Sequence, residues 1–419
     1  MPVRKTAVVV GASVAGVRTV QALRSEGFGG HIVLVGAEPD APYDRPPLSK
    51  QFLTGDWDAE RFVLFREADA AAAEVELRLG TAADHLDVAS RRVVLADGTS
   101  LPYDVCVLAT GAAARPSPWA ARSGVHLLRS LADSRKLRAD LERRGPVVVV
   151  GGGFIGAEVA AAAKKLGCEV TVVDPLTAPL ARAVGAEVGA LLSEVHSRHG
   201  VATRFGTGVE AIEGESGKLR VRLTDGAQLT AGTVVVGIGA VPNDGWLASS
   251  GLLVEDGVVC DQYCRTVDAP EVYAAGDVAR WLHTGRREHV RVEHWTNAVD
   301  QAVCVAHNIA RPDDLRPYLP VEYVWSDQYD WIIQIVGGPA RATAHHLIGE
   351  FAAGQVRGAA LYTDDTGQLT GAVTVNWPRA LAQCRRLLGT GTDFAAAVAQ
   401  LDALAATPAR VRRASGPAA

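Results

Sequence analysis

Two glycine-rich turns in the sequence have the residue types and the spacing that bind the pyrophosphate of a dinucleotide. In each, an apolar strand ends at a glycine, and further small residues follow two and five positions later. The six positions are Gly11, Ser13 and Gly16 in the first turn, and Gly151, Gly153 and Gly156 in the second. These residues allow a tight turn and the approach of backbone N–H groups, while the following helix supplies positive potential. Two such turns about 140 residues apart predict two bound dinucleotides and electron transfer between them.

Each turn is followed by an acidic residue at the end of the next apolar strand. Glu38 follows HIVLVGA, and Asp174 follows CEVTVV. A carboxylate at this spacing can accept hydrogen bonds from an adenosine ribose. At Asp174 it would also repel the extra phosphate of NADP, and neither Pro175 nor Leu176 after it is basic, so NADH is expected at the second site. The alternative is that a turn merely packs a helix on a sheet.

Two further strands end in residues suited to a flavin. The apolar strand at 105–108 ends in Ala109, Thr110 and Gly111, and EVYAAGDVAR ends another strand at Asp277. An aspartate at a strand end can accept a hydrogen bond from a hydroxyl group of a ribityl chain. The AAGD run alone would fit any turn between a strand and a helix.

Together with PYDRPPLSK at 42–50, these motifs resemble those of the FAD-dependent pyridine-nucleotide reductases of the glutathione-reductase fold. PPLSK, EHWTNAVDQ at 293–301 and WSDQYD at 325–330 are similar to the ferredoxin-reductase branch, which includes putidaredoxin reductase and the reductase components of aromatic-ring dioxygenases. The resemblance runs from about Thr6 to Leu401. It implies an α/β fold class, with two nested Rossmann-like dinucleotide-binding domains plus a small α+β C-terminal domain.

The resemblance also implies a division of the chain. The expected parts are a discontinuous FAD-binding domain at 1–113 and 240–316, an NAD-binding domain at 114–239, a C-terminal reductase domain at 317–404 and a mobile tail at 405–419. In the C-terminal domain, runs that begin at 323, 351 and 367 predict three antiparallel strands separated by glycine turns. Helices at about 378–388 and 393–404 follow.

Two charged residues are expected to lie beside the flavin ring. Lys50 matches a family lysine near the hydride-accepting nitrogen, where a cation stabilises the reduced ring, and Glu158 matches the carboxylate that pairs with it. Hydride transfer to a flavin needs no acid, base or nucleophile from the protein, so the protein must supply geometry and electrostatics. Lys50 and Glu158 are therefore the predicted catalytic residues. Without the resemblance, Lys50 would be a solvated lysine and Glu158 a first-turn acid favoured by the helix dipole.

The resemblance also implies which residues contact the two cofactors, FAD and NADH. For FAD they are Gly11, Ser13, Ala15, Gly16, Glu38, Arg45, Lys50, Ala83, Thr110, Gly111, Arg129, Asp277 and Trp295. For NADH they are Gly151, Gly153, Ile155, Gly156, Glu158, Asp174 and Gly239. Ser13 departs from the family glycine and narrows the approach to the phosphate. Arg129 could equally be a helix-capping residue, and Trp295 an ordinary core aromatic residue.

Composition and charge exclude several other classes. A net charge of −5 without a basic stripe argues against a nucleic-acid partner. The longest apolar stretch, 147–163, contains three consecutive glycines and Glu158, so a buried strand followed by a helix fits better than a membrane span. A core strand is reached by Ala7, leaving no room for a signal peptide. A cytoplasmic protein, monomeric or weakly dimeric, is expected.

The six cysteines include no C-x-x-C or metal-ligand spacing, so no metal site is expected. Cys260 and Cys264 are the only close pair. Disulfide reductases of the resembled fold carry a cysteine pair soon after the acidic residue that corresponds to Glu38. This chain has no cysteine between Glu38 and Lys50. Electrons on the flavin would therefore need an external acceptor.

The expected function is an NADH-dependent, FAD-containing reductase that passes single electrons to a 2Fe-2S ferredoxin, which feeds a haem monooxygenase or a ring-hydroxylating oxygenase. The alternatives are a rubredoxin reductase, an apoptosis-inducing-factor-like flavoprotein that responds to NADH, and a binding module without activity. The acceptor is expected where the C-terminal domain meets the flavin domain, with Trp325 approaching the ring. Candidates for docking are Arg379, Arg385 and Arg386, although a solvated helix face explains them equally well. Trp377 replaces a residue that is often arginine in the family.

Overall fold

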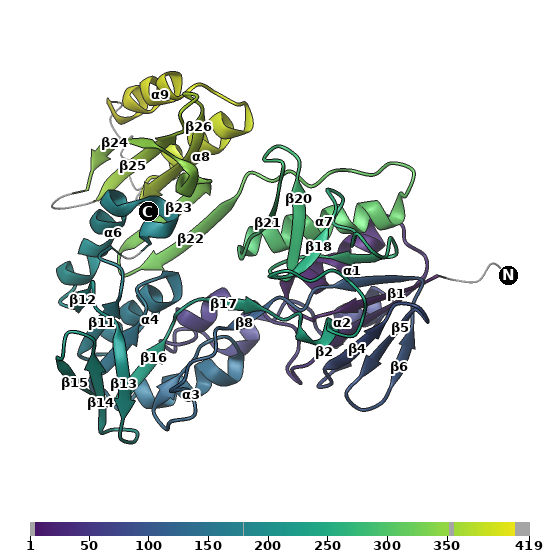
Figure 1. The fold of residues 1–419 in the computed structure, drawn as a ribbon, viewed down its shortest axis with the longest axis horizontal. Helices are drawn as coiled ribbons and strands as arrows, with labels where there is room; N and C mark the ends of the chain where they lie inside the picture. The colour runs from purple at the N-terminus through teal and green to yellow at the C-terminus, as the bar shows by residue number, and fades with distance from the viewer. Residues whose placement is uncertain (1–4, 179, 352–355, 407–419) are drawn as a thin grey trace, which may run out of the picture. The chain divides into compact units, whose positions relative to one another are not determined.

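The fold is seen in a computed structural model that describes residues 5–178, 180–351 and 356–406 (Figure 1). Through its internal contacts the chain divides into two compact units. The first comprises residues 1–179 and 196–320, and the second comprises residues 180–195 and 321–419. Of the predicted tail at 405–419, residues 407–419 lie outside the described part of the chain, and the first two belong to a helix.

The first unit contains a five-stranded parallel sheet of order β19-β7-β1-β2-β3. Its strands are β1 (Thr6–Val10), β2 (His31–Gly36), β3 (Val75–Leu79), β7 (Val105–Leu108) and β19 (Val272–Ala274). α1 (Val14–Ser25) follows β1 and packs against α7 (Trp295–Ala310). Val10 pairs with both Val35 and Leu108, so three strands end side by side at one edge. The residues after these strands are therefore brought together.

A second five-stranded parallel sheet, of order β12-β11-β10-β16-β9, has the same construction. Its strands are β9 (Val125–His126), β10 (Val147–Val150), β11 (Val170–Asp174), β12 (Ala202–Phe205) and β16 (Thr233–Val236). The helices near it in sequence are α3 (Leu131–Leu141), α4 (Phe154–Lys165), α5 (Ala181–Val184) and α6 (Ala186–Arg198). The expectation of a buried strand followed by a helix at 147–163 is confirmed by β10 and α4.

The second sheet is inserted within the first. The chain leaves the first sheet after β7 and returns to it only at β19. It crosses through a two-stranded ribbon of β8 (Ala112–Ala114) and β17 (Ala240–Pro242), on which the predicted boundaries at 113 and 240 lie. The predicted fold class of two nested dinucleotide-binding domains is confirmed by this topology, whereas the exact boundaries stay a prediction.

Smaller elements complete the first unit. One three-stranded antiparallel sheet contains β4 (Ala83–Asp87), β5 (Arg92–Leu95) and β6 (Ser100–Pro102). A second contains β13 (Val209–Glu213), β14 (Leu219–Leu223) and β15 (Gln228–Ala231). A mixed sheet contains β18 (Val258–Cys260), β20 (Ala279–His283) and β21 (Glu288–Arg291). The short helices are η1 (Pro46–Ser49), η2 (Ala59–Phe62), α2 (Glu67–Ala72) and η3 (Gly245–Leu247). No helix of the described residues is both long and apolar enough to cross a membrane.

The second unit is built on a five-stranded antiparallel sheet of order β22-β23-β26-β25-β24. Its elements are β22 (Tyr323–Gln328), β23 (Trp331–Gly337), η4 (Pro339–Arg341), β24 (Ala344–Glu350), β25 (Arg357–Thr363), β26 (Leu369–Val375), α8 (Pro378–Gly389) and α9 (Phe394–Ala406). α8 and α9 pack on the sheet (Figure 1). Tyr362 of β25 donates a hydrogen bond to the carbonyl of Val184, at 2.7 Å, which ties α5 to this unit.

The expectation of three strands in this unit is wrong, because the sheet has five. The first run is divided at Tyr329, a non-glycine residue with a φ of +57°, into the hairpin of β22 and β23. β24 was not predicted, since its sequence AHHLIGE lacks an unbroken apolar run. The predicted helices are present as α8 and α9.

Both glycine-rich turns depend on close approach of backbone to backbone. A Cβ atom at Gly16 would clash with the carbonyl oxygen of Gly11, and one at Gly156 would clash with that of Gly151. At Gly153, by contrast, a Cβ atom would meet no heavy atom within 4 Å. The third glycine of each turn, Gly16 or Gly156, is therefore needed by the fold itself, whereas Gly153 leaves space open for a ligand.

We expect Gly156→Ala to lower the free energy of unfolding by at least about 2 kcal/mol, because the clash outweighs the roughly 1 kcal/mol that alanine gains over glycine inside a helix. Gly153→Ala is the matched control and should remain within about 0.5 kcal/mol of the unmodified protein. Urea unfolding followed by circular dichroism measures both. Equal stabilities of the two variants would contradict the role given to Gly156.

Candidate functional site

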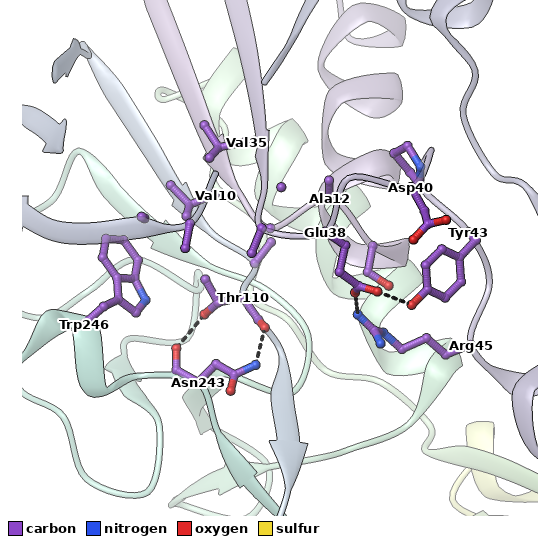
Figure 2. A pocket seen from close by; sticks show the side chains of 18 residues that line it. Val10, Ala12, Val35, Glu38, Asp40, Tyr43, Arg45, Thr110, Asn243 and Trp246 are labelled. Carbon is purple, nitrogen blue, oxygen red and sulfur yellow. Dashed lines mark hydrogen bonds and ion pairs between the residues drawn. The ribbon is translucent and has the colours of Figure 1, made fainter. Parts of the chain in front are cut away.

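A cavity of about 350 Å³ lies at the edge where β1, β2 and β7 end (Figure 2). Ligands of open parallel sheets bind at this edge. Predicted FAD-binding residues that line it are Gly11, Ser13, Glu38, Arg45, Ala83 and Thr110. Residues that the sequence analysis missed are Ala12, Ala37, Asp40, Tyr43, Asn243 and Trp246. The structure thus brings parts of the first turn, Glu38 and part of the segment at 42–50 to one cavity.

Ser13 is accommodated by the protein although it replaces a glycine. It is the N-cap residue of α1, has extended backbone angles and makes no side-chain capping bond. The equivalent position of the second turn, Gly153, has open space where a Cβ atom would lie. The Ser13 side chain is thus expected to clash with no protein group and to narrow only the space through which a ligand approaches the backbone of the turn.

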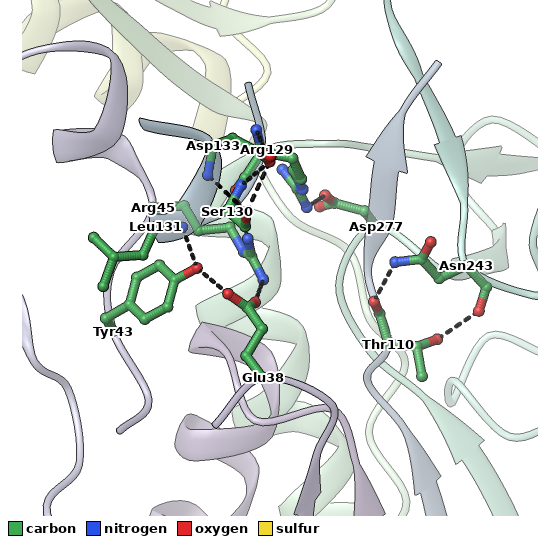
Figure 3. Close-up of polar contacts among 10 residues, drawn as sticks. All are labelled: Glu38, Tyr43, Arg45, Thr110, Arg129, Ser130, Leu131, Asp133, Asn243 and Asp277. Atoms are coloured by element: carbon green, nitrogen blue, oxygen red, sulfur yellow. Dashed lines mark hydrogen bonds and ion pairs between the residues drawn. The ribbon is translucent and has the colours of Figure 1, made fainter. Parts of the chain in front are cut away.

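A chain of polar contacts connects four predicted FAD-binding residues (Figure 3). Arg45 Nη2 lies 2.8 Å from Glu38 Oε1, and Arg45 Nη1 donates a hydrogen bond to the carbonyl of Arg129 at 2.5 Å. Arg129 Nη2 in turn pairs with Asp277 Oδ2 at 3.0 Å. Burial lowers the pKa of Arg129, and the Asp277 carboxylate opposes that shift. Residues from four separate segments therefore form one electrostatic network.

The turn after β7 is fixed by Asn243. Thr110 Oγ1 donates to the carbonyl of Asn243 at 2.8 Å, and Asn243 Nδ2 donates to the carbonyl of Thr110 at 2.9 Å (Figures 2 and 3). The backbone N–H of Asn243 also donates to the carbonyl of Gly111. This reciprocal pairing holds Thr110 and Gly111 at the cavity edge.

The donors around the cavity fit a dinucleotide pyrophosphate. Arg129 Nε and Trp246 Nε1 are buried and have no hydrogen-bond partner among the residues that the structure describes. Buried polar groups are usually paired, so such donors indicate a missing acceptor. With the cations of Arg45 and Arg129 and the N-terminus of α1 nearby, a phosphate-bearing ligand would supply that acceptor.

Trp295 connects the start of α7 to the segment at 42–50. Its indole Nε1 donates a hydrogen bond to Asp44 Oδ1 at 2.6 Å. Burial raises the pKa of Asp44, and this hydrogen bond opposes the shift. Nearby, Gln301 Oε1 accepts the backbone N–H of Gly276, the residue before Asp277, at 2.9 Å. The structure therefore places Trp295 at the predicted flavin-binding segment, and its contact with a flavin ring stays a prediction.

Lys50 and Glu158 form a buried ion pair. Lys50 follows η1, Glu158 lies in α4, and Lys50 Nζ is 2.9 Å from Glu158 Oε1. The side chains are only 11% and 3% exposed, so Lys50 is not a solvated surface lysine. Ser49 donates its hydroxyl proton to Glu158 Oε2 at 2.5 Å, a contact that the sequence analysis missed. A segment of the first nucleotide site is thereby joined to the helix that follows the second glycine-rich turn.

The second turn has its predicted acid in place. Val150 pairs with both Val173 and Val236, so Gly151 and Asp174 lie at one sheet edge. Asp174 Oδ2 accepts the backbone N–H of Gly152, and Oδ1 accepts that of Leu176, both at 2.7 Å.

A carboxylate oxygen has two lone pairs, so each oxygen of Asp174 retains one for a ribose hydroxyl. Two large apolar side chains near this edge, Ile155 and Ile238, are exposed, and Gly239 follows with a φ of +110°. An open turn bordered by exposed apolar side chains fits a bound ring.

In the second unit, several residues expected to meet a partner have contacts within that unit. Trp325 stacks on Tyr323 with ring centroids 6.0 Å apart. The guanidinium of Arg385 lies 5.1 Å from the centroid of Tyr323, and Arg386 donates to Gln400. Trp377 is buried in the core, with the guanidinium of Arg357 over its ring. A docking role for the arginines, Arg379 included, stays a prediction.

All six cysteines are free thiols. Burial raises the pKa of every one of them, so the thiols stay protonated at neutral pH. Among the described residues, no group of three or more His, Cys, Asp or Glu side chains could hold a metal ion.

Comparison with known proteins gives matches over nearly the whole chain. Residues 5–302 match the family described as pyridine nucleotide-disulphide oxidoreductase, and residues 323–405 match the one described as reductase C-terminal. The ferredoxin–NAD(+) reductase component of the anthranilate 1,2-dioxygenase system of Burkholderia cepacia is 41% identical over 92% of this chain and 94% of its own.

Solved structures of ferredoxin reductases also match nearly the whole chain. The ferredoxin reductase for the CYP199A2 system of Rhodopseudomonas palustris is 34% identical, with a TM-score of 0.88 over 93% of this chain and 96% of its own. The reductase in a covalent putidaredoxin reductase–putidaredoxin complex is 31% identical, with a TM-score of 0.87 over 96% of this chain and 99% of its own.

We expect Lys50→Met to lower the free energy of unfolding by about 3 kcal/mol, because it leaves the buried Glu158 carboxylate without its cation. Adding Glu158→Gln should recover most of this loss, since the two substitutions remove one interaction. Lys165→Met is the control, because Lys165 pairs with Asp56 on the surface of the same unit and should contribute under about 1 kcal/mol. Additive effects of the first two substitutions in urea unfolding would show that Lys50 and Glu158 do not act as a pair.

Proposed function

The chain belongs to the pyridine nucleotide-disulphide oxidoreductase family and, within it, to the ferredoxin–NAD(+) reductases, and we propose that it passes electrons from NADH through FAD to a ferredoxin. The observation that carries the proposal is the buried pair of Lys50 and Glu158, which joins the FAD-binding segment to the helix of the second turn. A relay between two dinucleotides needs their sites to meet in this way. We further propose that the ferredoxin contains a 2Fe-2S cluster and feeds a ring-hydroxylating oxygenase or a haem monooxygenase.

The network around the first turn would hold FAD. The backbone N–H groups at the N-terminus of α1 would face a pyrophosphate, and Arg129 offers an unpartnered Nε to the same region. Glu38 would accept hydrogen bonds from the adenosine ribose and Asp277 from the ribityl chain. When bound, FAD accepts a hydride and releases electrons one at a time.

The second turn would hold NADH. The open space at Gly153 would admit the pyrophosphate, and Asp174 would present its remaining lone pairs to the ribose. Ile155 would provide an apolar surface for the nicotinamide end. Because Asp174 is anionic and its neighbours are not basic, this site favours a ribose without a 2′-phosphate.

Lys50 and Glu158 would supply the electrostatics of the transfer. The Lys50 ammonium is largely removed from water, so its positive charge acts strongly on groups beside it. Glu158, which accepts a hydrogen bond from Ser49, holds that ammonium in place before any charge moves. Preorganised charge of this kind stabilises a transition state without reorganisation of solvent.

The thiols would not divert the electrons. No cysteine lies between Glu38 and Lys50, and all six thiols stay protonated at neutral pH. An internal disulfide relay is therefore not part of the proposal, and an external acceptor protein completes the reaction.

We expect the purified protein, loaded with FAD, to reduce cytochrome c with NADH at least about tenfold faster when a 2Fe-2S ferredoxin is added, because the ferredoxin carries electrons that the large acceptor takes up poorly from the reductase itself. Ferricyanide reduction without ferredoxin is the control for flavin reduction. Stimulation by rubredoxin alone would reassign the acceptor. If the protein reduces ferricyanide but no added iron-sulfur protein speeds its reduction of cytochrome c, the proposed function is contradicted.

We expect kcat/KM to be at least about tenfold higher with NADH than with NADPH, which corresponds to about 1.4 kcal/mol of repulsion between Asp174 and the 2′-phosphate. Asp174→Asn should narrow the difference, because it removes the charge while its side-chain oxygen can still accept one backbone N–H. Steady-state ferricyanide reduction measures both ratios. Equal efficiency of the unmodified protein with both nucleotides would refute the role of Asp174.

A further inference from the structure

The Glu38 carboxylate is held at both of its oxygens. Arg45 Nη2 donates to Oε1 at 2.8 Å, and the Tyr43 hydroxyl donates to Oε2 at 2.5 Å (Figure 3). Glu38 and Tyr43 both line the cavity (Figure 2). The orientation of this carboxylate is therefore set by two neighbours and not by Glu38 alone.

Tyr43 is itself firmly placed. The residue is 5% exposed, and its ring packs edge-on against Phe62 with an interplanar angle of 81°. Its hydroxyl oxygen accepts the backbone N–H of Leu131 at 2.9 Å. That N–H belongs to the first residue of α3, where helix donors have no partner within the helix. The Tyr43 hydroxyl thus links a helix N-terminus to the Glu38 carboxylate.

The direction of this link is fixed by the state of the phenol. Burial raises the pKa of Tyr43, with Arg45 opposing and Glu38 adding to the shift. The phenol keeps its proton at neutral pH, and because Leu131 donates to its oxygen, that proton is directed to Glu38. Hydrogen bonds in such a series strengthen one another.

Tyr43 also limits what Arg45 can do. A guanidinium beside a carboxylate commonly forms a bidentate pair with both oxygens. Here Arg45 gives Nη2 to Glu38 and Nη1 to the carbonyl of Arg129, while the Tyr43 hydroxyl occupies the second carboxylate oxygen. Without that hydroxyl, the carboxylate could rotate and pair with Arg45 through both oxygens.

The arrangement leaves acceptor positions for a ribose. An ionised carboxylate has about four lone-pair sites. Arg45 and Tyr43 each use one, on different oxygens, so each oxygen of Glu38 retains one site. A ribose has two neighbouring hydroxyl groups, and one acceptor site on each oxygen matches them.

We propose that Tyr43 is a positioning residue that fixes the Glu38 carboxylate for the adenosine ribose of FAD. The inference rests on the FAD site of the proposed function and adds to it the residue that sets the orientation of the ribose acid. The adenosine half of the site is thereby tied to the first turn of α3, the helix that connects β9 and β10 of the second sheet.

The test is the binding of FAD to protein from which the cofactor has been removed, measured through quenching of flavin fluorescence. Tyr43→Phe keeps the ring and removes the hydroxyl, and it should raise the Kd for FAD at least about tenfold, as expected for loss of a hydrogen bond to a charged group. Tyr103→Phe is the matched control. Tyr103 is 4% exposed, and its hydroxyl has no partner among the described residues, so its removal should change the Kd less than about twofold.

A second measurement separates positioning from general stability. If Tyr43 acts through Glu38, then in a Glu38→Gln background Tyr43→Phe should raise the Kd further by less than about threefold. A purely structural role would give the same factor in both backgrounds. Circular dichroism and thermal unfolding of all variants without FAD show whether each is folded.

Each outcome has a consequence. A tenfold effect that shrinks in the Glu38→Gln background supports the proposal. A Kd unchanged by Tyr43→Phe overturns it, as does an equal factor in both backgrounds. A Tyr43→Phe protein that does not fold also overturns it, because the hydroxyl would then serve the fold through the Leu131 N–H and not the orientation of Glu38. Failure of the unmodified protein to bind FAD would instead contradict the proposed function itself.

Discussion

The buried pair of Lys50 and Glu158 is the interaction on which the arrangement of the first unit depends. Removing two charges from water is unfavourable unless each finds a close partner and further hydrogen bonds. Lys50 and Glu158 meet at 2.9 Å, and Ser49 donates to the second carboxylate oxygen. The two partners come from the segment after η1 and from α4, so the pair forms only when these two segments are correctly packed. The same charges that position these elements would then act on the flavin.

Both parallel sheets could be predicted from local patterns in the sequence, and their nesting was implied by the resemblance to a known family. Apolar runs ending in glycine marked β1 and β10, and acids at fixed spacing marked where β2 and β11 end. The C-terminal sheet was predicted less well. Its hairpin turns at Tyr329 without a glycine, and β24 contains two adjacent histidines. At Tyr329 the fold imposes a turn, and at β24 it imposes a strand, that the local sequence does not indicate.

Within the candidate site, the charged residues were predicted, including the pairing of Lys50 with Glu158, but the hydroxyl groups that hold the carboxylates were not. Tyr43 and Ser49 stand in the quoted segment PYDRPPLSK, yet their roles depend on contacts with distant segments. Ser49 meets Glu158 across 109 positions, and Tyr43 meets Leu131 across 88. A hydroxyl group has no sequence pattern that names its acceptor. Such residues become visible only when the fold has placed both partners.

The insertion of one sheet within the other also orders events during synthesis of the chain. The second sheet has all its strands once Val236 has left the ribosome, whereas the first lacks β19 until Ala274 has emerged. The nucleotide domain that begins first is therefore finished last. Since domains generally fold as units during synthesis, the inserted domain can fold while Glu38 and Arg45 still await Asp277. The nascent chain thus acquires its second nucleotide site before its first is complete.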